Sequence, residues 1–251
     1  VGGPGSARVV KIDLNQALDE LELARGMDRE EVVANALVKV GIAYLERGRL
    51  DQAAEALEEA RHYCVQLDNP TGVAQVDLRL AAIDQGRGDL AAAAERLNGA
   101  LKNFAAAEEI PGQVTALERL AQLLALAGRW GEAAACLERA LELISGAGDK
   151  VAEVVLNQNL APMLRRAGET ARSLAAYERM GLAAQELGDH QRLALALVGV
   201  GSLQAEAGSL GPALRNLAQA EAVYRELGQL TRANQVRAEI MRLGGQTDPQ
   251  S

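Results

Sequence analysis

The chain is 251 residues long and carries a formal net charge of −8, with 26 Lys and Arg against 34 Asp and Glu. This acidic balance argues against non-specific binding to nucleic acids or membranes, whose phosphates repel an anionic surface. Hydrophobic residues make up 49% of the chain and aromatic residues only 2%, so we expect a core of small and aliphatic side chains, which favour helices. The two cysteines, Cys64 and Cys136, have no paired spacing and favour free thiols in a reducing, cytoplasmic compartment.

The N-terminal residues precede any repeat. Residues 1–6 (VGGPGS) have the composition of a cloning remnant or a linker. Residues 7–28 include the amphipathic segment NQALDELELARG at 15–26, which we expect to form an N-terminal capping helix. No apolar run approaches the roughly 20 residues that a membrane-spanning helix needs, so no membrane partner is expected.

A 40-residue repeat begins at residue 29 and is marked by five evenly spaced glycines: Gly48, Gly88, Gly128, Gly168 and Gly208. Each repeat is expected to form two helices, because apolar residues recur at helical intervals on both sides of the glycine. The glycine itself can adopt the left-handed conformation that ends a helix. The five predicted repeats span residues 29–69, 70–109, 110–149, 150–189 and 190–229.

Residue size also recurs with the period of 40. One small position reads Gly41, Ala81, Ala121, Ala161 and Gly201. A second small position reads Ala53, Ala93, Ala133, Ser173 and Ala213. A larger position reads Leu57, Leu97, Leu137, Tyr177 and Leu217. Small side chains at fixed points let two helices approach closely, and the larger residue fills the space between repeats.

The array is expected to end in a polar cap. Residues 230–245 have the pattern of a sixth first helix, as the terminal unit of a solenoid requires. Residues 246–251 are then a short tail.

This order of small and large positions resembles the tetratricopeptide repeat (TPR) family over residues 29–229. The period is 40 instead of the usual about 34, and the proline that commonly ends the second helix is missing. The long repeat is similar to the arrays of kinesin light chains and spindle-orientation adaptors. The resemblance implies an all-α, right-handed superhelical solenoid of helix-turn-helix repeats, in which the first helices line a concave groove. Only the architecture is carried over, not those proteins' partners.

The sequence contains no catalytic constellation. His62 and His190 are the only histidines and fall in different repeats. The glycine-containing stretches at 86–88 and 145–148 lack the strand and the lysine of a phosphate-binding loop. We therefore predict that the protein is not an enzyme and uses no cofactor or metal.

Aligned as in TPR proteins, the inward face of the first helices is polar and partly basic. One row reads Lys39, Arg79, Arg119, Asn159 and Gly199, and the neighbouring row reads Val38, Leu78, Glu118, Gln158 and Val198. Further inward positions are Asn35, Gln75, Thr115, Ile42, Gln122 and Ser202, and Arg165 and Arg166 add charge in the fourth repeat. Amide and guanidinium groups in this arrangement suit an extended or helical peptide that carries acidic groups. The alternative is that these are ordinary solvated charges, some of them ion-paired between neighbouring repeats.

Two further features of the predicted groove bear on what it could bind. The family's carboxylate clamp, which grips chaperone C-termini, needs Lys and Asn where this chain has Val38 and Ile42, so that partner is not expected. Pro162 lies inside a predicted first helix and removes the hydrogen bond to the carbonyl of Gln158. Either the proline only kinks the helix, or the freed carbonyl accepts a hydrogen bond from a ligand.

Three functional hypotheses follow. The leading one is a non-catalytic protein–protein interaction scaffold or adaptor that binds a protein or peptide segment, with an acidic one best suited, in the concave groove. The alternative is a sensor or regulatory TPR domain of a larger multidomain signalling or transcription-regulating protein. A third hypothesis is self-association through the convex faces. No nucleic-acid partner is expected.

Overall fold

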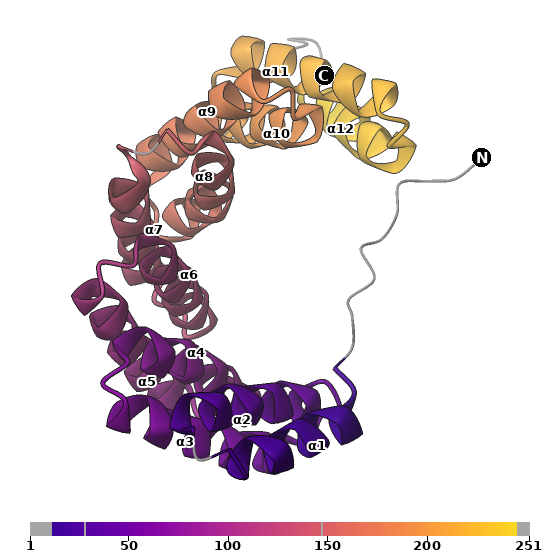
Figure 1. Cartoon of the computed structure of the whole chain (residues 1–251). Helices are drawn as coiled ribbons and strands as arrows, with labels where there is room; N and C mark the ends of the chain where they lie inside the picture. The colour runs from indigo at the N-terminus through magenta and orange to yellow at the C-terminus, as the bar shows by residue number, and fades with distance from the viewer. Residues whose placement is uncertain (1–11, 28, 147, 245–251) are drawn as a thin grey trace. The chain divides into compact units, whose positions relative to one another are not determined.

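The computed structural model describes residues 12–27, 29–146 and 148–244. Within these ranges the chain consists of α-helices joined by short turns and contains no strand. Figure 1 shows the helices following one another from α1 to α12. The all-α architecture of consecutive helix pairs expected from the sequence is confirmed. The predicted linker at 1–6 and tail at 246–251 lie outside the described residues. No helix in the described ranges combines the length and the apolar character that crossing a membrane requires.

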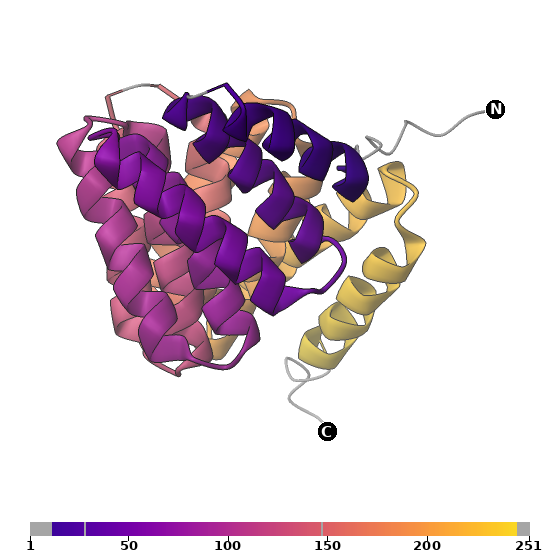
Figure 2. The same ribbon diagram turned by 60° about the horizontal axis from the view of Figure 1, so that its bottom comes forward.

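The chain divides into two compact units, Val1–Leu123 (unit 1) and Leu124–Ser251 (unit 2), a division that the 40-residue repeat does not indicate. The helices that begin in unit 1 are α1 (Leu14–Arg25), α2 (Glu30–Leu45), α3 (Leu50–Gln66), α4 (Pro70–Gly86), α5 (Leu90–Ala106) and α6 (Ile110–Leu126). Those of unit 2 are α7 (Trp130–Ile144), α8 (Lys150–Arg166), α9 (Thr170–Glu186), α10 (His190–Glu206), α11 (Leu210–Glu226) and α12 (Leu230–Gly244). Consecutive helices pack side by side from α1 to α5 in unit 1 and from α7 to α12 in unit 2, as the two views of Figures 1 and 2 show.

The repeat glycines end the first helix of each pair as expected. Gly48 has φ of +70°; its N–H donates to the carbonyl of Leu45 at 2.9 Å, and the next N–H, of Arg49, donates to Tyr44 at 3.0 Å. These paired bonds are a Schellman motif, which requires a left-handed residue. Gly88, Gly128, Gly168 and Gly208 have φ between +74° and +83°.

A second set of left-handed residues ends the second helix of each pair. Gly148, Gly188 and Gly228 occupy this position with φ of +65°, +67° and +70°. In unit 1 the same repeat position holds Asp68 and Glu108, with φ of 49° and 54°. Because an L side chain disfavours this region, those two turns are strained relative to the glycine turns.

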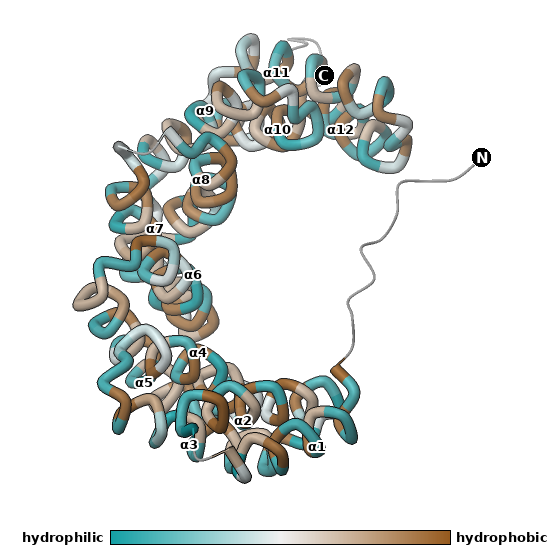
Figure 3. Tube along the Cα trace, viewed as in Figure 1, coloured by the Kyte–Doolittle hydropathy of each residue, from teal (hydrophilic) through white to brown (hydrophobic). Residues whose placement is uncertain are grey.

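The small positions of the repeat lie in the core. Ala53, Ala93, Ala133, Ser173 and Ala213 are all fully buried. At Gly41 an added Cβ would meet Cγ of Leu57 at 2.6 Å, and at Gly201 it would meet Cγ of Leu217 at 2.8 Å. A buried serine hydroxyl needs a partner, and Ser173 donates to the carbonyl of Ala161 at 2.7 Å. Figure 3 shows the resulting amphipathic pattern, with brown and teal alternating along each helix.

The larger position holds a tyrosine instead of a leucine in the fourth repeat. Tyr177 replaces the leucine found in the other repeats, and its ring lies against Gly199 of α10, where an added Cβ would meet Cε1 at 2.5 Å. Gly199 is buried, so it belongs to the core and not to the row of groove residues in which the sequence alignment placed it. The bulkier ring at one position is therefore accommodated by the absence of a side chain at the other.

Unit 1 contains a buried polar network. Asp77 of α4 is 3% exposed and accepts a hydrogen bond from Nε of Arg61 on α3 at 2.7 Å. Arg96 of α5 donates through Nε to Asp84 at 2.7 Å and through Nη2 to Glu58 at 2.6 Å, and its Nη1 lies 3.9 Å from the Asp77 carboxylate. Burial raises the pKa of Asp77 despite these arginines. The network ties three consecutive helices together.

Candidate functional site

The candidate site is a pocket between the first helices α4 and α6 of unit 1, with a volume of about 350 Å³. We call it the α4–α6 pocket. Its lining residues are Gln75, Leu78, Arg79, Phe104, Glu109, Pro111, Gly112, Thr115 and Arg119. Five of these (Gln75, Leu78, Arg79, Thr115 and Arg119) are among the residues that the sequence placed on the inward face. Residues four apart lie on one face of a helix, which is why α4 and α6 each present a polar residue and an arginine to the same space.

The two arginines give the pocket its electrostatic character. Nη1 of Arg79 donates to the carbonyl of Gln75 at 2.7 Å, one turn earlier on α4. Burial lowers the pKa of Arg79, and the positive charge of Arg119 lowers it further. Within the described ranges neither guanidinium forms an ion pair with a carboxylate, unlike most other arginines of unit 1. The pocket therefore holds two cationic groups that would gain from an anionic ligand.

Glu109 supplies an acceptor at the pocket's edge. Its Oε2 is buried and accepts no hydrogen bond from any described residue. The carboxylate lies over Gly112, where an added Cβ would meet Oε2 at 2.0 Å and Cδ1 of the Phe104 ring at 2.4 Å. Thr115 Oγ1 donates to the carbonyl of Pro111 at 2.9 Å, which leaves the hydroxyl oxygen able to accept. The pocket thus offers guanidinium donors together with oxygen acceptors over an apolar base formed by Leu78 and Phe104.

The remaining inward residues of unit 1 do not line this pocket. On α2, Asn35 and Lys39 are exposed, while Val38 and Ile42 are half-buried. Lys39 Nζ lies 2.7 Å from Oε2 of Glu20 on α1, and this hydrogen bond lowers the pKa of Glu20. Lys39 is therefore ion-paired, but with the helix before the first repeat and not with a neighbouring repeat. On α6, Glu118 is half-buried and Gln122 is exposed.

Unit 2 has its own pocket among α10, α11 and α12, with a volume of about 330 Å³. Two inward residues, Val198 and Ser202, line it together with Leu195, Leu217, Tyr224, Arg232, Gln235, Val236 and Glu239. The guanidinium of Arg232 lies 5.7 Å from the centre of the Tyr224 ring, a cation–π distance. From the sequence, α12 was expected only to cap the array, but its side chains also line this pocket.

The polar residues of α8 are largely engaged within unit 2. Oε1 of Gln158 accepts a hydrogen bond from Nε of Arg192 at 3.1 Å. Arg165 forms an ion pair with Glu206, and Arg166 lies over the ring of Trp130 at 5.4 Å. Asn159 is half-buried. These charges are used within unit 2, in contrast to the two arginines of the α4–α6 pocket.

In the ranges that the structure describes, no group of three His, Cys, Asp or Glu side chains is placed to hold a metal ion. Cys64 and Cys136 are both free, and burial raises the pKa of each thiol.

Comparison with known structures defines the class of fold. BtubC (BKLC) from P. vanneervenii aligns with a TM-score of 0.72 and 18% identity, over 89% of this chain and 93% of that one. A kinesin light chain of Podosopora anserina with nearly identical TPR-like repeats aligns with a TM-score of 0.65 and 16% identity, over 80% and 99% of the two chains. A Rap protein in complex with Competence and Sporulation Factor aligns with a TM-score of 0.59 and 15% identity, over 93% and 70%.

These alignments show that the protein has the fold of TPR-like repeat proteins. The repeat of the kinesin light chain type, to which the 40-residue period pointed, is among them. No protein-family model matches the sequence, and no curated protein matches it either.

Proposed function

We propose that this chain is a non-catalytic protein-interaction scaffold whose α4–α6 pocket receives an acidic segment of a protein partner. The observation that carries the proposal is the pair Arg79 and Arg119. In a chain with a net charge of −8, two arginines share one pocket without a carboxylate partner among the described residues. Their mutual repulsion and the burial of Arg79 are unfavourable in the free protein, and a bound carboxylate would relieve both.

The rest of the pocket favours a peptide over an inorganic anion. Leu78 and Phe104 give an apolar base that a phosphate or sulfate ion would not use. Glu109 Oε2 and the Thr115 hydroxyl are acceptors, which suit the N–H groups of a peptide backbone and not a second anion. A segment with one or two Asp or Glu side chains and an adjacent apolar residue would match all three parts of the pocket. Its carboxylates would pair with the arginines, its apolar residue would cover the apolar base, and its backbone N–H groups would donate to the oxygen acceptors.

The similar folds support an interaction role. One of them, the Rap protein, is crystallised in complex with Competence and Sporulation Factor. By analogy of fold, we extend a binding role to this chain, with the site argued from its own residues. The hypotheses of a sensor domain in a larger protein and of self-association stay predictions.

A peptide-selection experiment tests the proposal. Random peptides displayed on phage would be selected on the purified chain, and the affinities of enriched peptides measured by fluorescence anisotropy. We expect Asp and Glu to be enriched, and the Arg79→Glu, Arg119→Glu double variant to bind at least about tenfold more weakly, because two charge-assisted contacts are lost. Binding should also weaken as salt concentration rises.

Arg49→Glu is the matched control. Arg49 is exposed in unit 1 and forms no ion pair with a described residue, and it sits at the N-terminus of α3, where a carboxylate is well tolerated. This variant should bind acidic peptides within about twofold of the unmodified chain. Equal losses in the control and the double variant, or enrichment of basic peptides, would contradict the proposal.

A further inference from the structure

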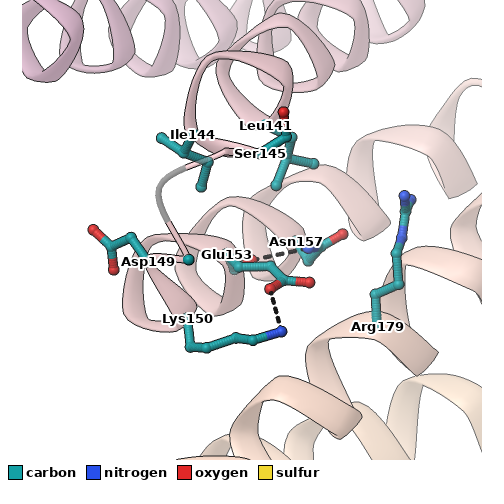
Figure 4. A pocket seen from close by; sticks show the side chains of 9 residues that line it. Leu141, Ile144, Ser145, Asp149, Lys150, Glu153, Asn157 and Arg179 are labelled. Carbon is teal, nitrogen blue, oxygen red and sulfur yellow. Dashed lines mark hydrogen bonds and ion pairs between the residues drawn. The ribbon is translucent and has the colours of Figure 1, made fainter.

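Unit 2 contains a pocket that the inward row of polar residues does not reach. It lies among the end of α7, the start of α8 and Arg179 of α9, and its volume is about 280 Å³. Its lining residues are Leu141, Ile144, Ser145, Gly148, Asp149, Lys150, Glu153, Asn157 and Arg179, most of them drawn in Figure 4. We call it the α7–α9 pocket. None of the residues assigned to the groove from the sequence is part of it.

Two local changes in the repeat open this pocket. Helix α7 has 15 residues, whereas α3, α5, α9 and α11 each have 17, so it ends before it can cover the start of α8. The following turn contains Gly148, with φ of +65° and no side chain to fill the space. The second change is at residue 157, where an asparagine occupies a position that is leucine in the first, third and fifth repeats. Leu37 and Leu117 are 1% and 0% exposed there.

Asn157 is the unusual group. It is 1% exposed, and its Nδ2 donates to the carbonyl of Glu153 at 2.9 Å, which fixes the orientation of the amide. Its Oδ1 is buried and accepts no hydrogen bond from any described residue. In Figure 4 this oxygen points away from Glu153, toward the side of the pocket where Arg179 lies. A buried acceptor without a donor is unfavourable, so the site is suited to a ligand that brings one.

The same repeat position in unit 1 shows what is missing. Asp77 stands where Asn157 stands, and Arg61 of the preceding helix donates to it at 2.7 Å. In unit 2 the residue corresponding to Arg61 is Leu141, which cannot donate and instead forms an apolar wall with Ile144. The donor that the fold supplies in one repeat is absent in the other.

The charges of the pocket are balanced but not fully paired. Lys150 Nζ lies 3.1 Å from Oε2 of Glu153 and 3.5 Å from Oε2 of Glu186, and the hydrogen bond to Glu153 raises the pKa of Lys150. Arg179 is exposed on α9 and has no carboxylate partner among the residues that the structure describes. A ligand therefore meets an uncompensated cation on one side and the oxygens of Asn157 and Glu153 on the other.

We propose that the α7–α9 pocket binds a small zwitterion with an apolar body, of which a free aliphatic α-amino acid is the simplest case. Its ammonium group would donate to Asn157 Oδ1 and to the Glu153 carboxylate. Its carboxylate would pair with Arg179, and its side chain would lie against Leu141 and Ile144. This site is independent of the α4–α6 pocket, since all its residues belong to unit 2.

L-leucine is the probe, with isothermal titration calorimetry as the measurement at ligand concentrations up to about 10 mM. Saturable binding of one leucine per chain is expected. N-acetyl-L-leucine lacks the ammonium group and L-leucinamide lacks the carboxylate, so each should bind at least about tenfold more weakly. Equal binding of N-acetyl-L-leucine would overturn the role assigned to the ammonium group and point to a peptide C-terminus.

Asn157→Leu and Arg179→Gln test the two recognition groups. Each should weaken leucine binding at least about tenfold. Arg139→Gln, at the repeat position of Arg179 but on α7 and outside the pocket, is the control and should stay within about twofold. Asn157→Leu inserts the residue of the equivalent buried positions, so it should unfold at a higher urea concentration than the unmodified chain, which separates lost binding from lost folding. Leucine binding that survives Asn157→Leu would show that leucine is not recognised by Asn157, and no saturation in the unmodified chain would show that the pocket holds only solvent; either result would overturn the proposal.

Discussion

The ion pair between Arg61 and Asp77 makes a quantitative prediction about which partner matters for stability. The two side chains are unequally placed: that of Asp77 is 4% exposed and that of Arg61 is 38% exposed. Removing Arg61 therefore strands a buried carboxylate, whereas removing Asp77 leaves a guanidinium that can turn to water. We predict that Arg61→Leu is much more destabilising than Asp77→Leu.

The structure sets the magnitudes. After Arg61→Leu, the nearest remaining cation to Asp77 is Nη1 of Arg96 at 3.9 Å, too far for a hydrogen bond, so the free energy of unfolding should fall by about 2–3 kcal/mol. Asp77→Leu places a leucine where Leu37 and Leu117 are buried, so it should change that free energy by no more than about 1 kcal/mol. The free energy of unfolding of the double variant should equal that of the unmodified chain or exceed it by up to about 4 kcal/mol, as is often found when apolar residues replace a buried ion pair.

Urea unfolding followed by far-ultraviolet circular dichroism measures all four proteins, and the double-mutant cycle gives the coupling between the two residues. The reasoning would be refuted if the two single variants cost the same. It would also be refuted if the double variant were as unstable as Arg61→Leu, because the buried pair would then be a net source of stability.

The pH dependence follows from the raised pKa of Asp77. Because burial raises the pKa in the folded chain, the folded state binds this proton more tightly than the unfolded state does. The unfavourable contribution of the carboxylate is thus complete above the raised pKa and disappears as pH falls toward the ordinary value of 3.8. The stability advantage of the double variant should accordingly shrink as the pH is lowered through that window, and a constant advantage from neutral pH to pH 3.8 would contradict the assignment.

Three further predictions concern single positions. Glu108→Gly should raise the free energy of unfolding by up to about 1 kcal/mol, because it relieves a left-handed residue at φ of 54°; a lower urea midpoint would refute this. Gly199→Ala should cost about 1–3 kcal/mol because the new Cβ would overlap the Tyr177 ring, and adding Tyr177→Leu should restore most of the loss in the same assay. Cys64 and Cys136, whose thiol pKa values are raised by burial, should both react with iodoacetamide more slowly than glutathione at neutral pH, with Cys136 the faster because it is less buried.

The helix pairs could be predicted because their signals are local. A glycine in the left-handed region and small residues at a fixed offset follow from backbone and packing geometry, and they recur five times in register. The second set of turns was not predicted, since Asp68 and Glu108 adopt the left-handed conformation without being glycine. There the packing of the flanking helices imposes a backbone conformation that the residue type does not favour.

The candidate site was predictable only where the repeat itself creates it. Arg79 and Arg119 are 40 residues apart and face the same pocket, so the periodicity was enough to pair them. Lys39 belongs to the same row, but Glu20 of α1 neutralises it, and that helix lies before the first repeat. A partner supplied from outside the repeat cannot be found by comparing repeats.

The position shared by Leu37, Asp77, Leu117, Asn157 and Leu197 allows the repeats to be compared with one another. Three repeats have leucine there, and Leu37 and Leu117 are almost completely buried, so the fold does not need a polar group at this position. In the second repeat the polar group is matched by Arg61, and the structural explanation is complete. In the fourth repeat the Asn157 oxygen has no such match within the described residues, and it lies beside a pocket where the neighbouring helix α7 is two residues shorter than the other second helices. A buried polar group that the packing does not require, and that has no hydrogen-bond donor, is better explained by ligand binding than by stability. Asn157→Leu separates the two explanations, because it should raise the stability of the chain and weaken the binding of leucine.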